Sequence, residues 1–250
     1  MSDGKTWAAD TLGAKIGEKS SGSYTDISIT SFYGSHIINC AGNGGALAIN
    51  DNSVMEKAKL LRSWGRSSSL FDEKSEKIEN RFNINIDGIP YDKKFVFESL
   101  GYNFEPSEIS AAFANVQLKK LNKNLSIRIK NFKQHLKFFR EQDRYFETPI
   151  EIKSARTGWL AFPIIVKKQK YFNRKDLQIY LEKQNIQTRV VFTGNILRQP
   201  GFKHLNKKYK KFKFYEADEV MRRGMLLGCH HGLDQKKIVY IHSCIKRFLK

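Results

Sequence analysis

The stretch Ser31-Phe-Tyr-Gly-Ser-His36, followed by Gly42-Asn-Gly-Gly45, decides how the fold of this chain is interpreted. Residues 26–32 alternate polar and apolar side chains, which predicts a β-strand ending near Ser31. A hydroxyl at a strand end, a turn and a glycine cluster can direct one O–H and several backbone N–H groups at a single anion. Taken alone, the stretch predicts either a phosphate-binding loop or an ordinary turn, and an ordinary turn is the commoner case.

Hydrophobic periodicity on both sides of this stretch predicts a chain in which helices and strands alternate. Residues 67–92 are rich in turn formers and are expected to be mostly loop. The other expected elements are strands at 46–49, 159–166 and 188–192, and helices at 51–64, from 106, at 124–140, 174–184 and 216–223, and from 234. This order favours an α/β fold, with one domain over residues 1–105 and linking helices plus a smaller α+β domain over residues 106–250.

The composition is that of a folded protein. The 250 residues are 40% hydrophobic and 12% aromatic, which allows a sizeable core. No apolar run reaches the roughly 18 residues of a membrane span, and the first residues lack a secretory-signal pattern. The three cysteines, Cys40, Cys229 and Cys244, are too scattered for a disulfide framework or a CxxC metal site. A reducing, cytoplasmic location is therefore expected, with no membrane partner.

The formal net charge of +19 has several interpretations. Lysine runs such as residues 119–124 and 207–213 are mixed with Asn, Leu, Tyr and Phe, which favours a solvated lysine-rich surface. Acidic substrates such as sugar nucleotides would be attracted to such a surface, and so would nucleic acid. No motif beyond the charge indicates nucleic-acid binding, so no nucleic-acid partner is expected.

Several motifs occur in order around the Ser31 stretch: AspThrLeuGlyAla (10–14), residues 31–36 and 42–45, LeuArgSerTrpGlyArg (61–66) and GlyTyrAsnPheGluPro (101–106). This series resembles the DegT/StrS-type sugar aminotransferase family, which has the type I pyridoxal-phosphate fold. Residues 187–202 and AlaAspGluValMetArgArgGly (217–224) resemble its 4-keto-6-deoxyhexose 3-dehydratase branch. The resemblance implies a partial large domain with a mixed sheet flanked by helices, followed by a small domain.

His36 stands where the aminotransferases of this family have the lysine that forms a Schiff base with the cofactor. An imidazole cannot form that bond, so the resemblance implies pyridoxamine phosphate, or pyridoxal phosphate, held without a covalent link. Because imidazole titrates near neutrality, His36 is the expected catalytic base that moves a proton while the C3 hydroxyl of the sugar leaves. For a lone histidine, a structural role is the alternative.

The resemblance implies further site residues. Ser31 matches the serine that binds the cofactor phosphate, and Asp10 matches a position near the cofactor ring hydroxyl, although Asp10 could equally be a turn cap. Asn103 matches an asparagine that reaches the phosphate of the neighbouring subunit, which implies a homodimer or a dimer with a full-length homologue. Arg189 and Asn195 lie in the expected substrate-facing loop, where a guanidinium suits a diphosphate but could also form a surface ion pair.

Three departures from the family pattern matter. Ser67, Ser68 and Ser69 stand where iron–sulfur members carry cysteines, so no iron–sulfur cluster is expected. GlyAsnGlyGly replaces a turn in which an acidic residue is common. Trp7 stands where the family has the aspartate that pairs with the pyridine nitrogen, and the long segment before it has no counterpart, which implies an N-terminally truncated member.

The adjacent His230 and His231, close to Cys229, are expected to lie on a strand and to point to opposite faces, so no metal site is predicted. The leading functional prediction is a lyase that dehydrates a nucleotide-bound 4-keto-6-deoxyhexose at C3. Such a lyase would act in the biosynthesis of polysaccharides such as the lipopolysaccharide O-antigen. The alternatives are a sugar aminotransferase, which His36 disfavours, and an inactive fragment that dimerises with an intact paralogue.

Overall fold

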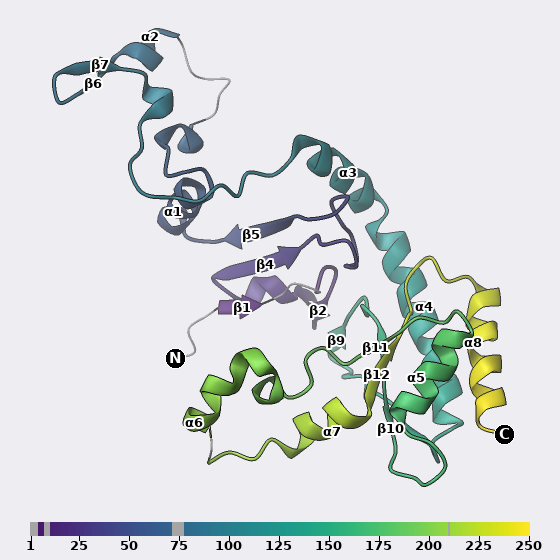
Figure 1. The fold of residues 1–250 in the computed structure, drawn as a ribbon. Coiled ribbons are helices and arrows are strands. Elements are labelled where there is room, and N and C mark those ends of the chain that lie inside the picture. The colour runs from purple at the N-terminus through teal and green to yellow at the C-terminus, as the bar shows by residue number, and fades with distance from the viewer. Residues whose placement is uncertain (1–4, 8–10, 72–77, 210) are drawn as a thin grey trace. The chain divides into compact units, whose positions relative to one another are not determined.

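The computed structural model describes the backbone of residues 5–7, 11–71, 78–209 and 211–250. The chain forms two compact units. The N-terminal unit consists of Met1–Ala9 and Ser20–Leu118, and the C-terminal unit of Asp10–Lys19 and Lys119–Lys250. Both contain helices and strands, as predicted for an α/β fold (Figure 1). The predicted boundary near residue 105 concerned the domains of the complete family fold and stays a prediction.

A three-stranded sheet with the order β1-β4-β5 organises the N-terminal unit. Strand β1 (Lys5–Trp7) runs parallel to β4 (Ile27–Ser31), which pairs antiparallel with β5 (Gly45–Ile49). Helix α1 (Asn52–Arg62) follows β5, and the Asp51 carboxylate caps it by accepting a 2.9 Å hydrogen bond from the Val54 N–H. The predicted strands at 26–32 and 46–49 and the helix at 51–64 are thus confirmed.

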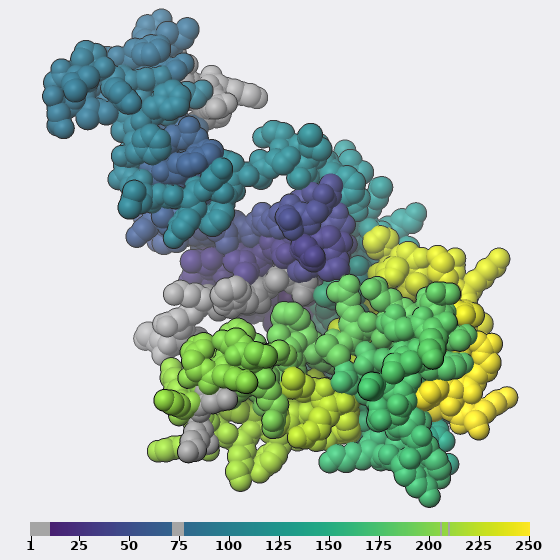
Figure 2. All heavy atoms as spheres, in the orientation of Figure 1, coloured from purple at the N-terminus to yellow at the C-terminus, as the bar shows by residue number. Residues whose placement is uncertain are grey.

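The rest of the N-terminal unit contains a hairpin in the stretch predicted to be loop. Asp87 and Gly88 both have positive φ, 50° and 87°, as a tight hairpin turn requires. In Figure 2 this blue-green hairpin projects as a separate lobe of the unit. The elements after α1 are η2 (Ser67–Leu70), α2 (Ile78–Phe82), β6 (Ile84–Ile86), β7 (Ile89–Tyr91), η4 (Lys93–Phe95) and α3 (Glu108–Lys119); η1 (Ser21–Tyr24) precedes β4.

An antiparallel sheet with the order β11-β12-β10-β8 forms the centre of the C-terminal unit. Its strands are β8 (Phe146–Glu147), β10 (Phe162–Val166), β11 (Thr188–Val190) and β12 (Gly224–Leu227). Its main helices are α4 (Leu121–Arg140), α5 (Arg174–Lys183), α7 (Tyr215–Arg223) and α8 (Gln235–Phe248), and α8 packs against α4 and α5. Shorter pieces are β2 (Lys15–Ile16), β3 (Lys19–Ser20), β9 (Ala155–Arg156), η5 (Ile196–Arg198), η6 (Pro200–Leu205) and α6 (Asn206–Tyr209).

One hydrophobic core lies in the C-terminal unit, between this sheet and its helices. Phe132 of α4 is fully buried and stacks on Trp159, with ring centroids 3.8 Å apart and planes 8° from parallel. Phe162 of β10 meets the Phe132 ring edge-on at 5.1 Å. Among the described side chains of the N-terminal unit, the buried apolar ones are Ile37, Ile38 and Cys40. The two units therefore differ sharply in how much apolar surface they bury.

Helix α4 also carries buried polar side chains that bind loop backbone. The Arg128 guanidinium, on a residue that is 3% exposed, donates to the carbonyls of Trp159 and Leu160 at 3.2 Å each. The Asn131 amide, three residues further along the helix, donates at 3.1 and 3.0 Å to two carbonyls of the loop 228–233. Buried polar groups of this kind stabilise a fold only when they are hydrogen-bonded, and these join two loops to one helix.

A pair of histidines continues this polar row. Nε2 of His135 lies 3.1 Å from the Gly228 carbonyl and so carries its proton, and Nδ1 lies 3.0 Å from Nε2 of His242, whose proton it accepts. Burial lowers the pKa of His135 to about 4. The pKa of His242, stacked on Phe138, falls to about 3, first through burial and then through the charges of His135 and Lys246. Both rings are therefore neutral at pH 7.

Candidate functional site

Ser31 ends β4, and His36 lies on the loop that joins β4 to β5. Ser31 is the last residue of β4 and lies opposite Gly45 of β5 in the strand register. The Phe32 N–H donates to the Gly44 carbonyl at 2.8 Å, and the His36 N–H donates to the Tyr33 carbonyl at 3.0 Å. Strand pairing thus fixes the hydroxyl, and a turn places the imidazole on the same loop.

The glycines of the loop have a packing reason. A Cβ at Gly44 would lie 2.9 Å from the Cys40 sulfur, and one at Gly45 would lie 3.0 Å from the Thr30 carbonyl. Gly42 has φ of 138°, a backbone conformation that side chains disfavour. The cluster therefore lets the loop return closely to β4, which accounts for the glycines of GlyAsnGlyGly.

The chemistry available on this loop is a hydroxyl and an imidazole. The Ser31 hydroxyl oxygen accepts from the Tyr33 N–H at 3.3 Å and can still donate its own proton to an anion. Ser31 and His36 are both half-buried, and the Tyr33 ring contacts the His36 ring edge-on at 6.0 Å. Ile37, next to His36, is buried and anchors this part of the loop.

Two predicted features lie just before this loop in the sequence. Asp10, predicted near the cofactor ring, falls outside the described residues. The backbone of Trp7 pairs with Ile29 in β1–β4, two residues before Ser31. An indole has no acidic proton to exchange and is a donor only, so it cannot act as the carboxylate partner of a pyridine nitrogen.

Asn103 lies on an extended segment beside the end of α1. It forms an antiparallel bridge with Ser63, flanked by hydrogen bonds from the Trp64 N–H to the Tyr102 carbonyl at 2.8 Å and from the Phe104 N–H to the Arg62 carbonyl at 2.9 Å. The Asn103 side chain is exposed. It is thus held by its backbone, which leaves its amide at the surface.

Arg189, predicted to face the substrate, lies in the C-terminal unit. It is an exposed residue of β11, opposite Leu226 in the register. It borders a shallow depression between β11 and α5 that Lys175, Lys183 and Glu182 also line. The predicted cofactor residues that are described, Ser31, His36 and Asn103, belong to the other unit.

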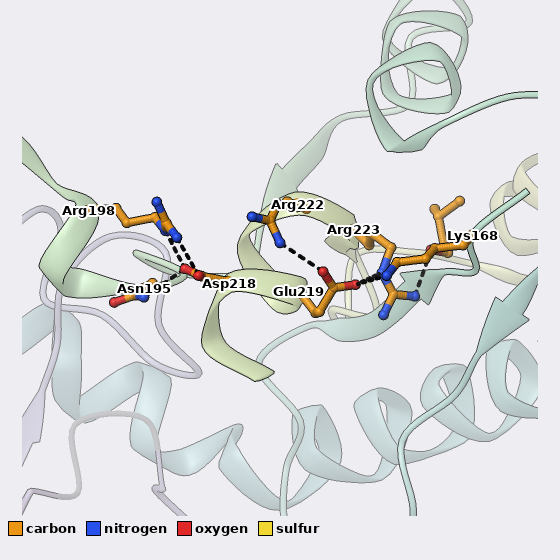
Figure 3. Close-up of polar contacts among 8 residues, drawn as sticks. Lys168, Asn195, Arg198, Asp218, Glu219, Arg222 and Arg223 are labelled. Carbon is orange, nitrogen blue, oxygen red and sulfur yellow. Dashed lines mark hydrogen bonds and ion pairs between the residues drawn. The ribbon is translucent and has the colours of Figure 1, made fainter. Parts of the chain in front are cut away.

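Asn195, the other predicted substrate residue, is buried and has partners within the protein. Its amide nitrogen donates to the Asp218 carboxylate at 2.7 Å, and its oxygen caps η5 by accepting from the Leu197 N–H at 3.1 Å. The Arg198 guanidinium donates two hydrogen bonds to the same carboxylate (Figure 3). The Arg198 side chain, followed by Asn195, holds the pKa of Asp218 well below its usual range.

Sequence reasoning missed Asp218 and Arg198, although both lie within motifs that it quoted. The sequence shows an arginine three residues after Asn195 and an aspartate in AlaAspGluVal. It gives no indication that these two residues, 20 positions apart, form an ion pair. The neighbouring Glu219 contacts a different set of cations, Arg222, Arg223 and Lys168 (Figure 3). Consecutive carboxylates of α7 thus serve two separate clusters.

The histidine pair was placed incorrectly. His230 and His231 follow the end of β12 in a turn and are not on a strand, and the His230 Nδ1 accepts from the Gly232 N–H at 3.2 Å. Within the described ranges, no three His, Cys, Asp or Glu side chains are placed to hold a metal ion, and the three cysteines are unpaired and buried. No helix in the described part of the chain is long and apolar enough to cross a bilayer.

The loop, the motifs and the fold all have counterparts in known proteins. The model of the DegT/DnrJ/EryC1/StrS aminotransferase family matches residues 6–246. The lipopolysaccharide biosynthesis protein RfbH of Salmonella typhimurium is 28% identical over 242 residues, which are 96% of this chain and 55% of that protein. The GDP-4-keto-6-deoxy-D-mannose 3-dehydratase of Escherichia coli is 26% identical over 95% of this chain and 58% of its own.

Solved structures of similar fold include a 3-dehydratase and an aminotransferase. The E. coli GDP-4-keto-6-deoxy-D-mannose-3-dehydratase with bound hydrated PLP superposes with a TM-score of 0.74 at 25% identity, over 93% of this chain and 57% of that chain. An aminotransferase from Psychrobacter cryohalolentis, at 17% identity, shares the fold with a TM-score of 0.80, over 97% and 60% of the two chains. The chain thus spans little more than half the length of the relatives it matches.

Proposed function

Because the chain belongs to the DegT/DnrJ/EryC1/StrS aminotransferase family, we propose that it provides the phosphate-binding serine and the base of a nucleotide-sugar 3-dehydratase. The substrate would be a nucleotide-bound 4-keto-6-deoxyhexose of polysaccharide biosynthesis, including lipopolysaccharide O-antigen. The observation that carries the proposal is His36, on the same short loop as Ser31, where the aminotransferase pattern has its lysine. The name of the 3-dehydratase supports this reaction, and the name of RfbH supports a place in lipopolysaccharide biosynthesis.

The residues of the loop fit one end of the cofactor. The Ser31 hydroxyl, at the end of β4, accepts one hydrogen bond and keeps its own proton to donate, which suits a phosphate. Pyridoxamine phosphate, or pyridoxal phosphate, would supply the electron sink for breaking the C3–O bond. Trp7 does not fit the ring nitrogen, so a carboxylate partner has to come from outside the residues of this loop.

His36 would hold and move a proton without bonding to the cofactor. The imidazole is half-buried, and the Tyr33 ring contacts it edge-on, so one ring nitrogen can serve as a proton acceptor beside the cofactor. A sugar aminotransferase is the alternative, and a UDP-sugar transaminase of Campylobacter jejuni is 27% identical to this chain. The histidine favours dehydration, because transamination by this family uses a lysine.

A partner subunit forms the second part of the proposal. Asn103 is exposed while its backbone is fixed, as a residue that serves a neighbouring site would need. We infer a homodimer or a dimer with a full-length homologue, in the cytoplasm. An inactive fragment that only contributes Asn103 to an intact partner is the second candidate, favoured by the small number of buried side chains among the described residues of the N-terminal unit.

A covalent trap tests where the cofactor binds. Replacing His36→Lys restores a primary amine, so pyridoxal phosphate followed by borohydride should label the peptide that contains residue 36. The matched control is His231→Lys, which places a lysine on an exposed turn of the other unit. Peptide mapping by mass spectrometry should find selective label at residue 36, which Ser31→Ala diminishes. Equal labelling of both variants, or label spread over surface lysines, would refute the proposal.

A further inference from the structure

Arg198 is fixed in place and yet faces solvent. Two of its five N–H groups bind the Asp218 carboxylate through Nε and Nη2, a bidentate geometry that fixes the plane of the guanidinium. The side chain remains 54% exposed, whereas that of Asp218 is 13% exposed. The three other N–H groups have no further partner in the described part of the chain, and they are the donors that a phosphate would use.

The segment that carries Arg198 is anchored at several points. Asp218 also binds Asn195, at the start of η5, and Arg198 is the last residue of η5. The Gln199 amide then donates to the Thr193 carbonyl at 3.1 Å, which closes the turn from the other side. An arginine held in this way loses little conformational freedom when it binds a ligand, and this pre-organisation favours affinity.

The stretch of sequence that contains Arg198 is positively charged. No acidic residue occurs between Glu182 and Glu216 in the sequence. Among the described residues of this interval, five exposed lysines follow Arg198: Lys203, Lys207, Lys208, Lys211 and Lys213. Such a field concentrates polyanions near the surface, and a fixed guanidinium then gives one of them a defined binding position.

The neighbouring carboxylate on α7 shows what a purely structural pair looks like. Glu219 binds Arg222 and Arg223 of its own helix, and the Arg223 guanidinium also donates to the Val166 carbonyl of β10 at 3.3 Å. Figure 3 shows the two clusters on opposite sides of α7. Arg222 is 61% exposed, close to the exposure of Arg198, but its partner lies one helical turn away on the same element.

We propose that Arg198, positioned by Asp218, binds the diphosphate of the nucleotide-activated sugar. The assignment rests on the proposed function and refines it. Asn195, which the sequence motifs placed at the substrate, anchors the loop that carries Arg198. Asp218 is a positioning residue, since it reaches the ligand only through Arg198. The ligand class is a nucleoside diphosphate or a sugar ester of one.

Calorimetric titration of the full chain with GDP, CDP, UDP and TDP tests the assignment. For the nucleotide that binds tightest, Arg198→Gln should raise Kd about tenfold or more, because a charge-assisted pair is lost. Arg198→Lys should fall between the two, since a lysine keeps the charge but not the fork. The matched control Arg222→Gln removes one similarly exposed charge and should change Kd by less than about twofold. Asp218→Asn should weaken binding less than Arg198→Gln does.

Three results would overturn the assignment: no binding of any of the four nucleotides, a Kd unaffected by Arg198→Gln, or equal weakening by Arg198→Gln and Arg222→Gln. The last would mean that only the general positive charge attracts the nucleotide. Circular dichroism of each variant checks that the C-terminal unit stays folded. The labelling of His36→Lys is independent of this titration, so failure at the loop and failure at Arg198 can be told apart.

Discussion

The two units of this chain differ in what holds them together. The C-terminal unit has a continuous core, with Phe132, Phe162 and Met225 fully buried between a four-stranded sheet and its helices. In the N-terminal unit, α1 and α3 have no buried residue, and Ile109 and Leu100 are 81% and 95% exposed. At about 25 cal/mol per Å² of apolar surface buried, such a unit gains little from folding by itself. The unit that carries the predicted cofactor residues is therefore the one that depends on further contacts.

Truncating one aromatic ring in each unit should give the largest contrast. Phe132→Ala removes a fully buried ring that stacks on Trp159, and it should lower the free energy of unfolding of the C-terminal unit by about 3–5 kcal/mol. Phe113→Ala acts on a ring of α3 that is 40% exposed and should cost less than about 1 kcal/mol. Urea unfolding followed by circular dichroism measures both. Similar losses would show that the N-terminal unit has a core of its own.

Acid should destabilise the C-terminal unit next most strongly. His135 has a pKa of about 4 in the folded protein and about 6.5 when unfolded, so below pH 6.5 the unfolded chain binds the proton that the native state excludes. Stability is therefore complete above that pH and falls as the pH drops towards 4, by about 2 kcal/mol for this group between pH 7 and pH 5. Urea titrations at several pH values measure the slope.

A matched pair of variants assigns that slope to the buried ring. His135→Gln keeps a donor for the Gly228 carbonyl but cannot titrate, so it should remove the His135 share of the pH dependence, whereas His204→Gln on the exposed surface should leave the slope unchanged. His242, with a pKa of about 3, keeps its own share in the His135→Gln variant, and a slope that His135→Gln does not reduce at all would contradict the prediction.

Helix caps should give the smallest contrast. The Asn173 side chain caps α5 in a capping box with Asp176, and Asn173→Ala should cost the C-terminal unit about 1 kcal/mol. The Asp51 side chain caps α1 by accepting from the Val54 N–H, but Asp51→Ala should leave the main thermal transition unmoved, because α1 contributes no buried side chain to it. Thermal melts of the two variants measure the shift. Equal shifts would mean that both units unfold together.

Local signals in the sequence were enough for most elements. Alternation predicted β4, and helical spacing predicted α1 and α8. The predicted strands and helices at β5, β10, α4 and α5 also lie within a few residues of their observed ends. Strand β12 (Gly224–Leu227) was missed, because four residues directly after a helix are too short to show a period. The hairpin at residues 84–91 was also missed, although Asp87-Gly88 is a strong turn signal, because the strands on each side have only three residues.

The candidate site was only partly predictable, for a physical reason. Ser31 and His36 lie on one loop, so their sequence spacing nearly fixes their placement. The role of Asp218 depends on two donors 20 or more residues away, and a single sequence carries no signal of such pairs. Family resemblance named Asn195 as a substrate residue, but it could not show that the amide is satisfied inside the protein.

The polar row of α4 has a consequence for how this half of the molecule can diverge. Arg128, Asn131 and His135 bind main-chain carbonyls, and every amino acid supplies a carbonyl. Exchange of side chains in the loops 157–160 and 228–233 therefore leaves those bonds in place, whereas exchange of the three helix residues breaks them. The sequences of the loops around such a helix can therefore change widely while the fold is kept, and only a few positions of the helix need to stay the same.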